Sequence, residues 1–240
     1  MRLDKYLADL QLGTRSQVKT DIRKGRVSVN GTVVTQPDYR LDESRDTVAY
    51  AGAVLTYRKY RYYMMYKPAG VVTATRDYYD KTVLDLLPDA LRTDLFPVGR
   101  LDKDTEGLLL LTNDGELAHC LLAPKKHVDK TYYAECSGTI SQEDIERLSR
   151  GVDIGDDTPT QPATLRLLSR TQEQYRLEIT VTEGRFHQIK RMIAAVGGTV
   201  TYLKRIAMGG VLLDETLAKG GYRELTAREE ALLMPLKAAE

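Results

Sequence analysis

The stretch 99–115, GRLDKDTEGLLLLTNDG, places three aspartates beside basic side chains. Asp102 and Asp104 closely follow Arg100, whereas Asp114 comes after four consecutive leucines. The leucine run predicts a buried strand, and the Asn-Asp-Gly sequence predicts the turn that leaves it. A rigid scaffold presents reactive groups on loops such as the one that leads into this strand. A carboxylate there is a candidate nucleophile or base, although loop aspartates are more commonly caps or turn residues.

The elements before this loop can be predicted from periodicity and capping residues. Leu3, Leu7 and Leu10 recur at helical spacing, and Thr14 or Ser16 can cap a second helix. The sequence RVSVNGTVV then alternates around an Asn-Gly pair, which predicts a two-residue hairpin. The N-terminal part of the chain is therefore expected to be a helix–helix–hairpin module, with a surplus of basic over acidic side chains.

Beyond this module, strands and helices alternate without a regular βαβ repeat, which predicts an α+β fold. We expect strands at 64–66, 107–112, 130–136, 175–182 and 200–206, and helices at 84–87, 141–151 and 187–196. The interleaved basic and aromatic side chains of 53–63 fit either a linker that enters a solvated strand or a strip along which RNA could lie.

The composition argues against several classes of protein. The two cysteines form no CxxC pair and the three histidines lack ligand spacing, which argues against a disulfide framework and a structural zinc site. A net charge of +1 neither demands nor excludes a nucleic-acid partner. The N-terminus carries charges throughout, and the longest aliphatic run, Leu108–Leu111, is far too short to span a bilayer. We therefore expect a soluble cytoplasmic protein.

The full string GRLDxDTxGLLLLTNDG resembles the signature of the RNA pseudouridine synthases, in the branch that modifies ribosomal RNA. Three further segments, YMMYKPAGVVTA, VTEGRFHQIKRMIAAVGGTV and LKRIAMGGVLLDETLAKGGYRELT, are similar to other segments of the family. The N-terminal sequence TRSQVKTDIRKGRVSVNG resembles the S4 RNA-binding domain. The HQIKR version of the third motif, with the S4 module attached, looks most like the RsuA type, which acts on 16S rRNA of the small subunit.

This resemblance implies an S4-like module at 1–50, a linker at 51–59, a catalytic domain at 60–234 and a tail at 235–240. The catalytic domain is expected to have a central mixed, mostly antiparallel sheet flanked by helices, with the site in a basic cleft across its middle. The small α/β S4-like module is expected to grip the phosphates of folded rRNA. The residues expected to do so are Arg15, Lys19, Arg23, Lys24 and Arg26.

The reaction that the resemblance implies breaks the N1–C1′ bond of a uridine, turns the base and rejoins it through C5, without a cofactor or a metal. Asp102 is expected to attack C1′ or to remove a ribose proton, and Lys190 to keep that carboxylate ionised. Tyr132 is expected to stack on the flipped base, while Arg100 fills the space that the base leaves.

Other residues of these motifs have less specific expected roles. Arg185 could supply the cation instead or contact phosphate, and His187 is expected to be structural or to contact RNA. Asp104 and Thr105 are expected to shape the loop by bonding to backbone amides, and Asp114 to be a turn residue.

Plainer interpretations stay open at this stage. Lys190 could lie on a solvated helix face, Tyr132 could be an ordinary strand residue, and Arg100 could form a salt bridge with Asp102 or Asp104. For the whole chain, the alternatives are a 23S rRNA synthase of the large subunit and a non-catalytic RNA-binding or ribosome-assembly protein. We expect 16S rRNA as the partner of a monomer that does not bind membranes.

Overall fold

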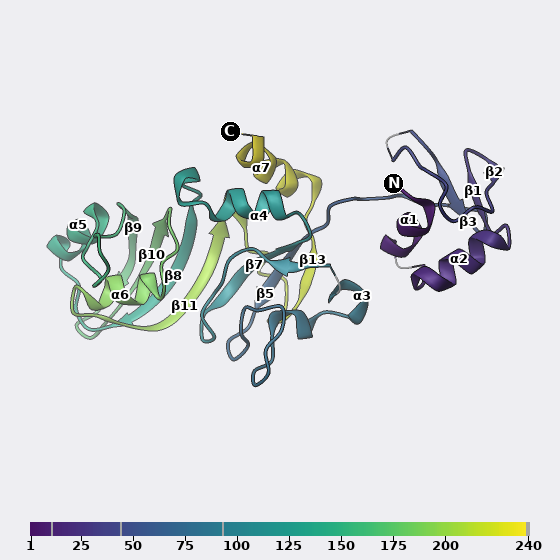
Figure 1. Cartoon of the computed structure of the whole chain (residues 1–240). Helices are drawn as coiled ribbons and strands as arrows, with labels where there is room; N and C mark the ends of the chain where they lie inside the picture. Colours follow the sequence, from purple (N-terminus) through teal and green to yellow (C-terminus); the bar gives the residue numbers. More distant parts are fainter. Residues whose placement is uncertain (11, 44, 93, 239–240) are drawn as a thin grey trace. The chain divides into compact units, whose positions relative to one another are not determined.

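The computed structural model describes residues 1–10, 12–43, 45–92 and 94–238, and the chain divides into two compact units, Met1–Lys59 and Tyr60–Glu240 (Figure 1). Each unit encloses hydrophobic side chains of its own. In the described part of the chain, no helix combines the length and the apolar character needed to cross a membrane.

The N-terminal unit pairs two helices with a four-stranded antiparallel sheet in the order β2-β1-β3-β4. Thr14 and Gln17 form a capping box at the second helix, and Asn30 and Gly31 turn the hairpin with φ angles of 51° and 81°. The predicted helix–helix–hairpin order is confirmed, while the segment expected as a linker, 51–59, contains the fourth strand. The elements are α1 (Leu3–Asp9), α2 (Arg15–Arg23), β1 (Val27–Val29), β2 (Thr32–Val33), β3 (Val48–Tyr50) and β4 (Ala53–Val54).

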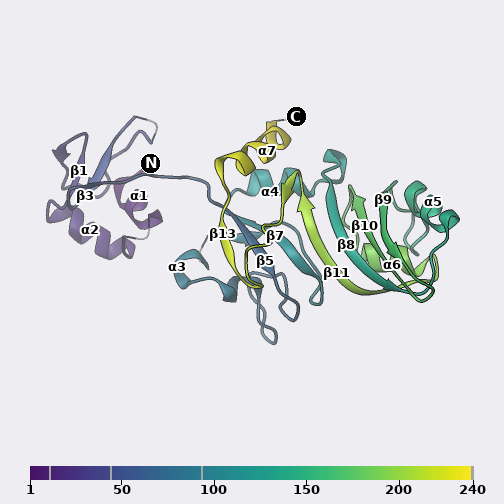
Figure 2. The same ribbon diagram turned by 180° about the vertical axis from the view of Figure 1, so that it is seen from behind.

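The C-terminal unit is built on a nine-stranded sheet with the path β13-β5-β7-β11-β8-β10-β9, to which β6 and β12 add short edges (Figure 2). Only the β7–β11 pairing is parallel among the described strands, so the expected mixed, mostly antiparallel sheet is confirmed. The strands are β5 (Tyr62–Lys67), β6 (Phe96–Pro97), β7 (Glu106–Thr112), β8 (Lys130–Ser137), β9 (Thr164–Arg170), β10 (Gln174–Val181), β11 (Thr199–Met208), β12 (Val211–Leu212) and β13 (Tyr222–Glu224).

Helices cover this sheet in separate groups (Figures 1 and 2). The helices α4 and α7 pack against β5 and β7 in one core, whereas α5 and α6 pack against β8, β10 and β11 in another. The short helices are η1 (Val83–Leu86), α3 (Asp89–Arg92) and η2 (Pro124–Lys126), and the longer ones are α4 (Gly115–Leu122), α5 (Gln142–Arg150), α6 (Gln188–Ala194) and α7 (Ala227–Ala238).

The strand β7 is buried on both faces, which explains its run of leucines. Leu108 and Leu110 enter the core beneath α4, while Leu109 and Leu111 enter the core that contains η1. At its start, β7 approaches β11 so closely that a Cβ at Gly107 would lie 2.2 Å from the carbonyl oxygen of Arg205. Because Gly107 also has a φ of 103°, only glycine fits here. This contact fixes the point at which the Asp102 loop enters the sheet.

Several elements differ from the sequence-based expectation. Asp114 is not a turn residue: it is fully buried and caps α4, a helix that was not expected, by accepting a hydrogen bond from the backbone N–H of Leu117. The strand β9 was also not expected, and the helix expected at 84–87 is a 3₁₀ turn. The boundary expected before residue 235 falls inside α7, and the last two residues of the expected tail lie outside the described residues.

Candidate active site

A cleft of about 860 Å³ crosses the C-terminal unit where the Asp102 loop faces the start of β8. Three segments that are distant in sequence meet in it: the loops 72–75 and 99–103, and the turn that precedes α6. Its lining includes Arg100, Asp102, Lys130, Tyr132, Arg185, Phe186, His187 and Arg205. The cleft therefore combines one carboxylate with several cations and exposed aromatic surface.

Lys190 lies between the two carboxylates of the loop. Its Nζ is 2.9 Å from Oδ2 of Asp102 and donates a hydrogen bond to Oδ1 of Asp104 at 2.6 Å. The side chains of Lys190 and Asp102 are 24% and 26% exposed, so the pair is only partly screened by water. The plainer interpretation, in which Lys190 lies on a solvated helix face, is therefore wrong.

The contacts of Lys190 favour its charged form. Burial alone would lower the pKa of Lys190, but its hydrogen bonds to Asp104 and Asp102 outweigh burial and raise that pKa. The hydrogen bond from Lys190 holds the pKa of Asp104 below its ordinary value. Asp104 was expected to bond backbone amides; its own backbone N–H does contribute to lowering this pKa, but the larger contribution comes from Lys190, which α6 brings directly to the loop.

A second lysine, for which the sequence pattern predicted no role, supports the backbone of the loop. Lys67 is fully buried at the end of β5, and its Nζ donates to the carbonyl oxygens of Pro68, Asp102 and Thr105 at 2.8–3.0 Å. From another side, Thr73 Oγ1 donates to the carbonyl of Leu101 at 2.8 Å. The backbone of the loop is thereby fixed on both sides of Asp102.

Lys67→Met should loosen this loop. The carbonyl oxygens would lose their donor in a buried place, so we expect the free energy of unfolding to fall by about 1–3 kcal/mol. A displaced carboxylate loses its alignment with the reacting atoms, so we also expect the rate of the reaction to fall by about 10- to 100-fold. Denaturant titration and initial rates measure the two effects. An unchanged rate would show that the loop holds its position without Lys67.

Lys67 also predicts an alkaline limit of activity. Burial, opposed by the charges of Asp104 and Asp102, lowers the pKa of Lys67 to about 8 from an ordinary 10.5. Above that pH its amine keeps two N–H donors where the ammonium had three. Over the same interval the unfolded chain still holds a proton that the folded chain has lost, so this group makes the free energy of unfolding rise with pH. We expect the rate to fall above about pH 8 while the fold persists.

A pH–rate profile recorded beside circular dichroism tests this limit. Lys130 is the necessary comparison, because burial lowers its pKa to about 8 as well. The alkaline fall should remain in the Lys130→Met variant. If it disappears there, the limit belongs to Lys130, and the role given to Lys67 is wrong.

Tyr132 and Arg100 both line the cleft that contains Asp102. Tyr132 lies on β8 opposite Arg205 of β11, and its ring packs partly against two of the hydrophobic cores. Arg100 is exposed, at the edge of the same cleft. This placement brings the predicted stacking residue and the predicted space-filling residue together with the carboxylate.

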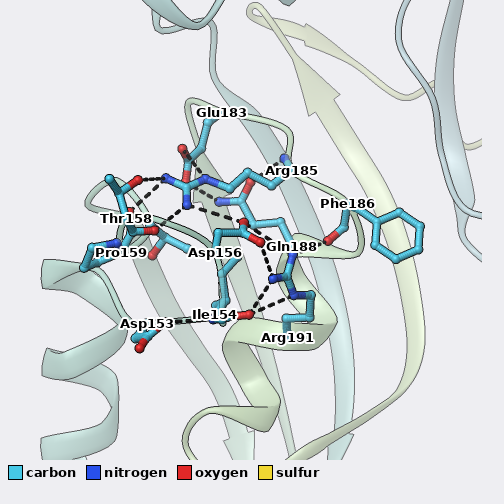
Figure 3. Close-up of polar contacts among 12 residues, drawn as sticks. Asp153, Ile154, Asp156, Thr158, Pro159, Glu183, Arg185, Phe186, Gln188 and Arg191 are labelled. Carbon is cyan, nitrogen blue, oxygen red and sulfur yellow. Dashed lines mark hydrogen bonds and ion pairs between the residues drawn. The ribbon is translucent and has the colours of Figure 1, made fainter.

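The turn before α6 is held by a dense set of polar contacts (Figure 3). The guanidinium of Arg185 donates to the carbonyl oxygens of Thr158 and Pro159 and to the carboxylate of Glu183. Because these partners occupy Arg185, the geometry favours a role in positioning the turn, and its contact with phosphate stays a prediction. The turn places His187 Nε2 3.6 Å from Oδ1 of Asp102, beyond hydrogen-bonding distance.

The floor of the cleft contains two buried cations that the sequence-based analysis also missed. Arg205 is 2% exposed and donates from Nε to the carbonyl of Leu108, and its Nη2 has no hydrogen-bond partner among the described residues. Lys130 is 6% exposed and donates to the carbonyl of Val128. Both side chains line the cleft, so an anion entering it would meet a positively charged floor.

The basic residues predicted for the N-terminal unit have different surroundings. Arg15, Arg23 and Lys24 are exposed on or beside α2. Lys19 lies 3.8 Å from a carboxylate oxygen of Asp4, and Arg26 pairs at 2.9 Å with Asp21. The role of all five in binding phosphate stays a prediction. Within the described ranges, no group of three or more His, Cys, Asp or Glu side chains is arranged to hold a metal ion.

Comparisons with known proteins give consistent results. Residues 61–195 match the family model described as RNA pseudouridylate synthase, and residues 1–47 match the S4 domain. The chain is 47% identical to an uncharacterised RNA pseudouridine synthase of Bacillus subtilis (strain 168), with 97% of this chain and 98% of the relative covered. It is 40% identical to ribosomal small subunit pseudouridine synthase A of Escherichia coli (strain K12), over 96% of this chain and 99% of that one. A crystal structure of a pseudouridylate synthase, 36% identical, superposes with a TM-score of 0.69 and covers 97% of this chain and 99% of its own.

Proposed function

Since the chain belongs to the RNA pseudouridylate synthase family and is an RNA pseudouridine synthase, we propose that it converts one uridine of 16S ribosomal RNA to pseudouridine, acting as a monomer. The observation that supports this chemistry is the 2.9 Å contact between Lys190 Nζ and the Asp102 carboxylate, at a cleft that Asp102 and Tyr132 both line. The choice of 16S rRNA rests on the relative whose name refers to the small ribosomal subunit.

In the proposed mechanism, the target uridine is extruded from the RNA so that its base enters the cleft. The base stacks on Tyr132 while the Asp102 carboxylate either attacks C1′ or removes a ribose proton, and the N1–C1′ bond breaks. The base turns and a C5–C1′ bond forms, as the carboxylate either leaves C1′ or returns the proton to the ribose. The proton on C5 then leaves, and N1 gains one. Bonds and electrons balance within the nucleotide, so the chain's own side chains suffice.

Lys190 has an electrostatic role in this mechanism. The phosphates of RNA that approaches the cleft repel the negative charge of Asp102. The ammonium of Lys190, 2.9 Å from Asp102, offsets that repulsion. The buried cations Arg205 and Lys130 and the exposed Arg100 suit the RNA backbone. The basic residues of the S4 unit supply further phosphate contacts, which give affinity with little reading of sequence.

Incubation with separate 16S and 23S transcripts, and with isolated small and large subunits, tests the substrate. We expect pseudouridine at one position of 16S rRNA, mapped by mass spectrometry of nuclease fragments after a carbodiimide label has been attached to pseudouridine, because the isomerisation itself changes no mass. Product on 23S rRNA alone would refute the 16S substrate and leave the large-subunit alternative. Comparing transcript with subunit also shows whether free RNA or an assembled particle is preferred.

A further inference from the structure

Phe186 stands out on the wall of the cleft because its large apolar side chain is 72% exposed. The chain has only two phenylalanines, and this one lines the same cleft as Asp102 and Tyr132. A single exposed apolar residue needs no explanation by itself, but this ring lines the cleft that contains Asp102. Aromatic rings exposed in a cleft are suited to stacking on unpaired nucleobases.

The backbone on both sides of this ring is held in place. The carbonyl oxygen of Phe186 accepts a hydrogen bond from Arg191 Nη1 at 3.0 Å, and Arg191 also binds the carbonyl of Ile154 and the carboxylate of Asp156. On the preceding side, Arg185 is bound through its guanidinium, and its N–H donates to Gln188 Oε1 at 2.9 Å. Figure 3 shows the ring of Phe186 pointing away from these contacts. The turn therefore holds the ring of Phe186 in place in the free protein, so RNA binding does not have to order it.

The ring of Phe186 also has a partner on the side of the reacting carboxylate. It stacks on the imidazole of His187 with ring centroids 3.8 Å apart and planes 18° apart. His187 in turn lies 3.6 Å from Asp102. One face of Phe186 is therefore covered, and a planar group added to its exposed surface would continue a stack that begins beside the chemistry.

We propose that the exposed surface of Phe186 stacks on the nucleobase next to the target uridine, in an unpaired or locally opened stretch of RNA. Extrusion of a uridine removes a stacking partner from its neighbours, and an aromatic ring at the mouth of the cleft replaces that partner. The inference rests on the proposed function, because it requires the uridine to enter this cleft. In this role Phe186 binds the substrate RNA by stacking, and it accepts any base at that position.

Substitutions separate a stacking role from a merely apolar one. Phe186→Ala and Phe186→Leu should both weaken RNA binding by about 5- to 100-fold, the range given by the loss of one aromatic–base stack. Phe186→Tyr should bind as the wild type does, because the π face is kept. Thermal unfolding should barely change in any of them, since the ring is mostly exposed. If the Phe186→Leu variant binds RNA as tightly as the wild type, Phe186 provides only apolar cover and does not stack on a base.

A tryptophan probe observes the stack directly. The chain contains no tryptophan, so Phe186→Trp introduces a single tryptophan at the cleft, whose emission can be excited separately from that of the tyrosines. Its emission should be quenched on titration with a 16S transcript. Leu212→Trp is the matched control, since Leu212 is 68% exposed on β12 and does not line the cleft. Quenching at both positions, or at neither, would overturn the proposal.

The test also separates this inference from the proposed function. Wild-type turnover of 16S rRNA, together with unquenched emission from the Phe186→Trp variant, rejects the stack and leaves the function standing. Absence of wild-type turnover on 16S rRNA, with product on another RNA, rejects the proposed substrate, and the titration is then repeated with that RNA. In that case quenching of Phe186→Trp but not of Leu212→Trp still supports the stack.

Discussion

Asp102→Asn is expected to lower pseudouridine formation by about 10⁴-fold or more, the order of loss that follows removal of a group that reacts directly. Asparagine has the same shape but no charge, so it can neither attack C1′ nor take a ribose proton. The backbone carbonyl of Asp102, which accepts from Lys67 and from the N–H of Thr105, is unaffected. Lys190 also keeps its hydrogen bond to Asp104, so we expect the free energy of unfolding to change by no more than about 1 kcal/mol.

Asp104→Asn is the matched control for that prediction. Asp104 lies two residues further on and binds the same lysine, but its side chain is 73% exposed. The Asp104→Asn substitution leaves the Asp102–Lys190 pair intact, so we expect the rate of pseudouridine formation to change by less than about 10-fold. Pseudouridine content after complete digestion of the RNA measures both variants. Equal losses at the two positions would mean that the carboxylates act together and that the assignment to Asp102 alone is wrong.

Lys190→Met is expected to have the second largest effect, a loss of about 10²-fold. Removing one preorganised group that stabilises charge in an active site costs about 10²- to 10³-fold in rate, and the partial exposure of this pair places the loss at the lower end of that range. Asp102 would then face RNA phosphates without its cation. Initial rates measured from pH 5 to 9 quantify the loss.

Two comparisons make the Lys190 prediction specific. Lys103→Met removes a lysine adjacent to Asp102 in sequence, but Lys103 pairs with Asp80 at 2.6 Å and should matter little. Lys190→Arg keeps the charge with a different shape, so we expect it to recover part of the lost rate. If Lys103→Met is as damaging as Lys190→Met, general positive potential explains the effect, and the direct pair does not.

The sequence predicted local features best where a short pattern carries its own physical reason. The Asn-Gly hairpin and the Ser141–Asp144 capping box both occur as expected, because each is decided within a few residues. The leucine run of β7 was also predicted, since a strand buried on two faces cannot alternate. Resemblance to the family predicted that Asp102 and Lys190 lie close together, and their side chains are 2.9 Å apart.

What the sequence did not predict depends on contacts between distant segments. Asp114 looked like a turn residue because the partners that bury its carboxylate, Tyr62 and Lys237, lie far away in the chain. The support that Lys67 gives to the loop depends on carbonyl groups, which every residue has. The strand β9 was missed because its side chains are mostly exposed and show no alternation of burial.

Tritium release from 16S transcript labelled at C5 of uridine tests the central claim most directly, because C5 loses its hydrogen only when the new bond forms there. We would measure it under single turnover, with enzyme in excess, for the wild type and Asp102→Asn, after showing that both bind the transcript equally. We expect prompt release by the wild type and none above background by Asp102→Asn. Release by Asp102→Asn at the wild-type rate would contradict the account, because the chemistry would then not need this carboxylate.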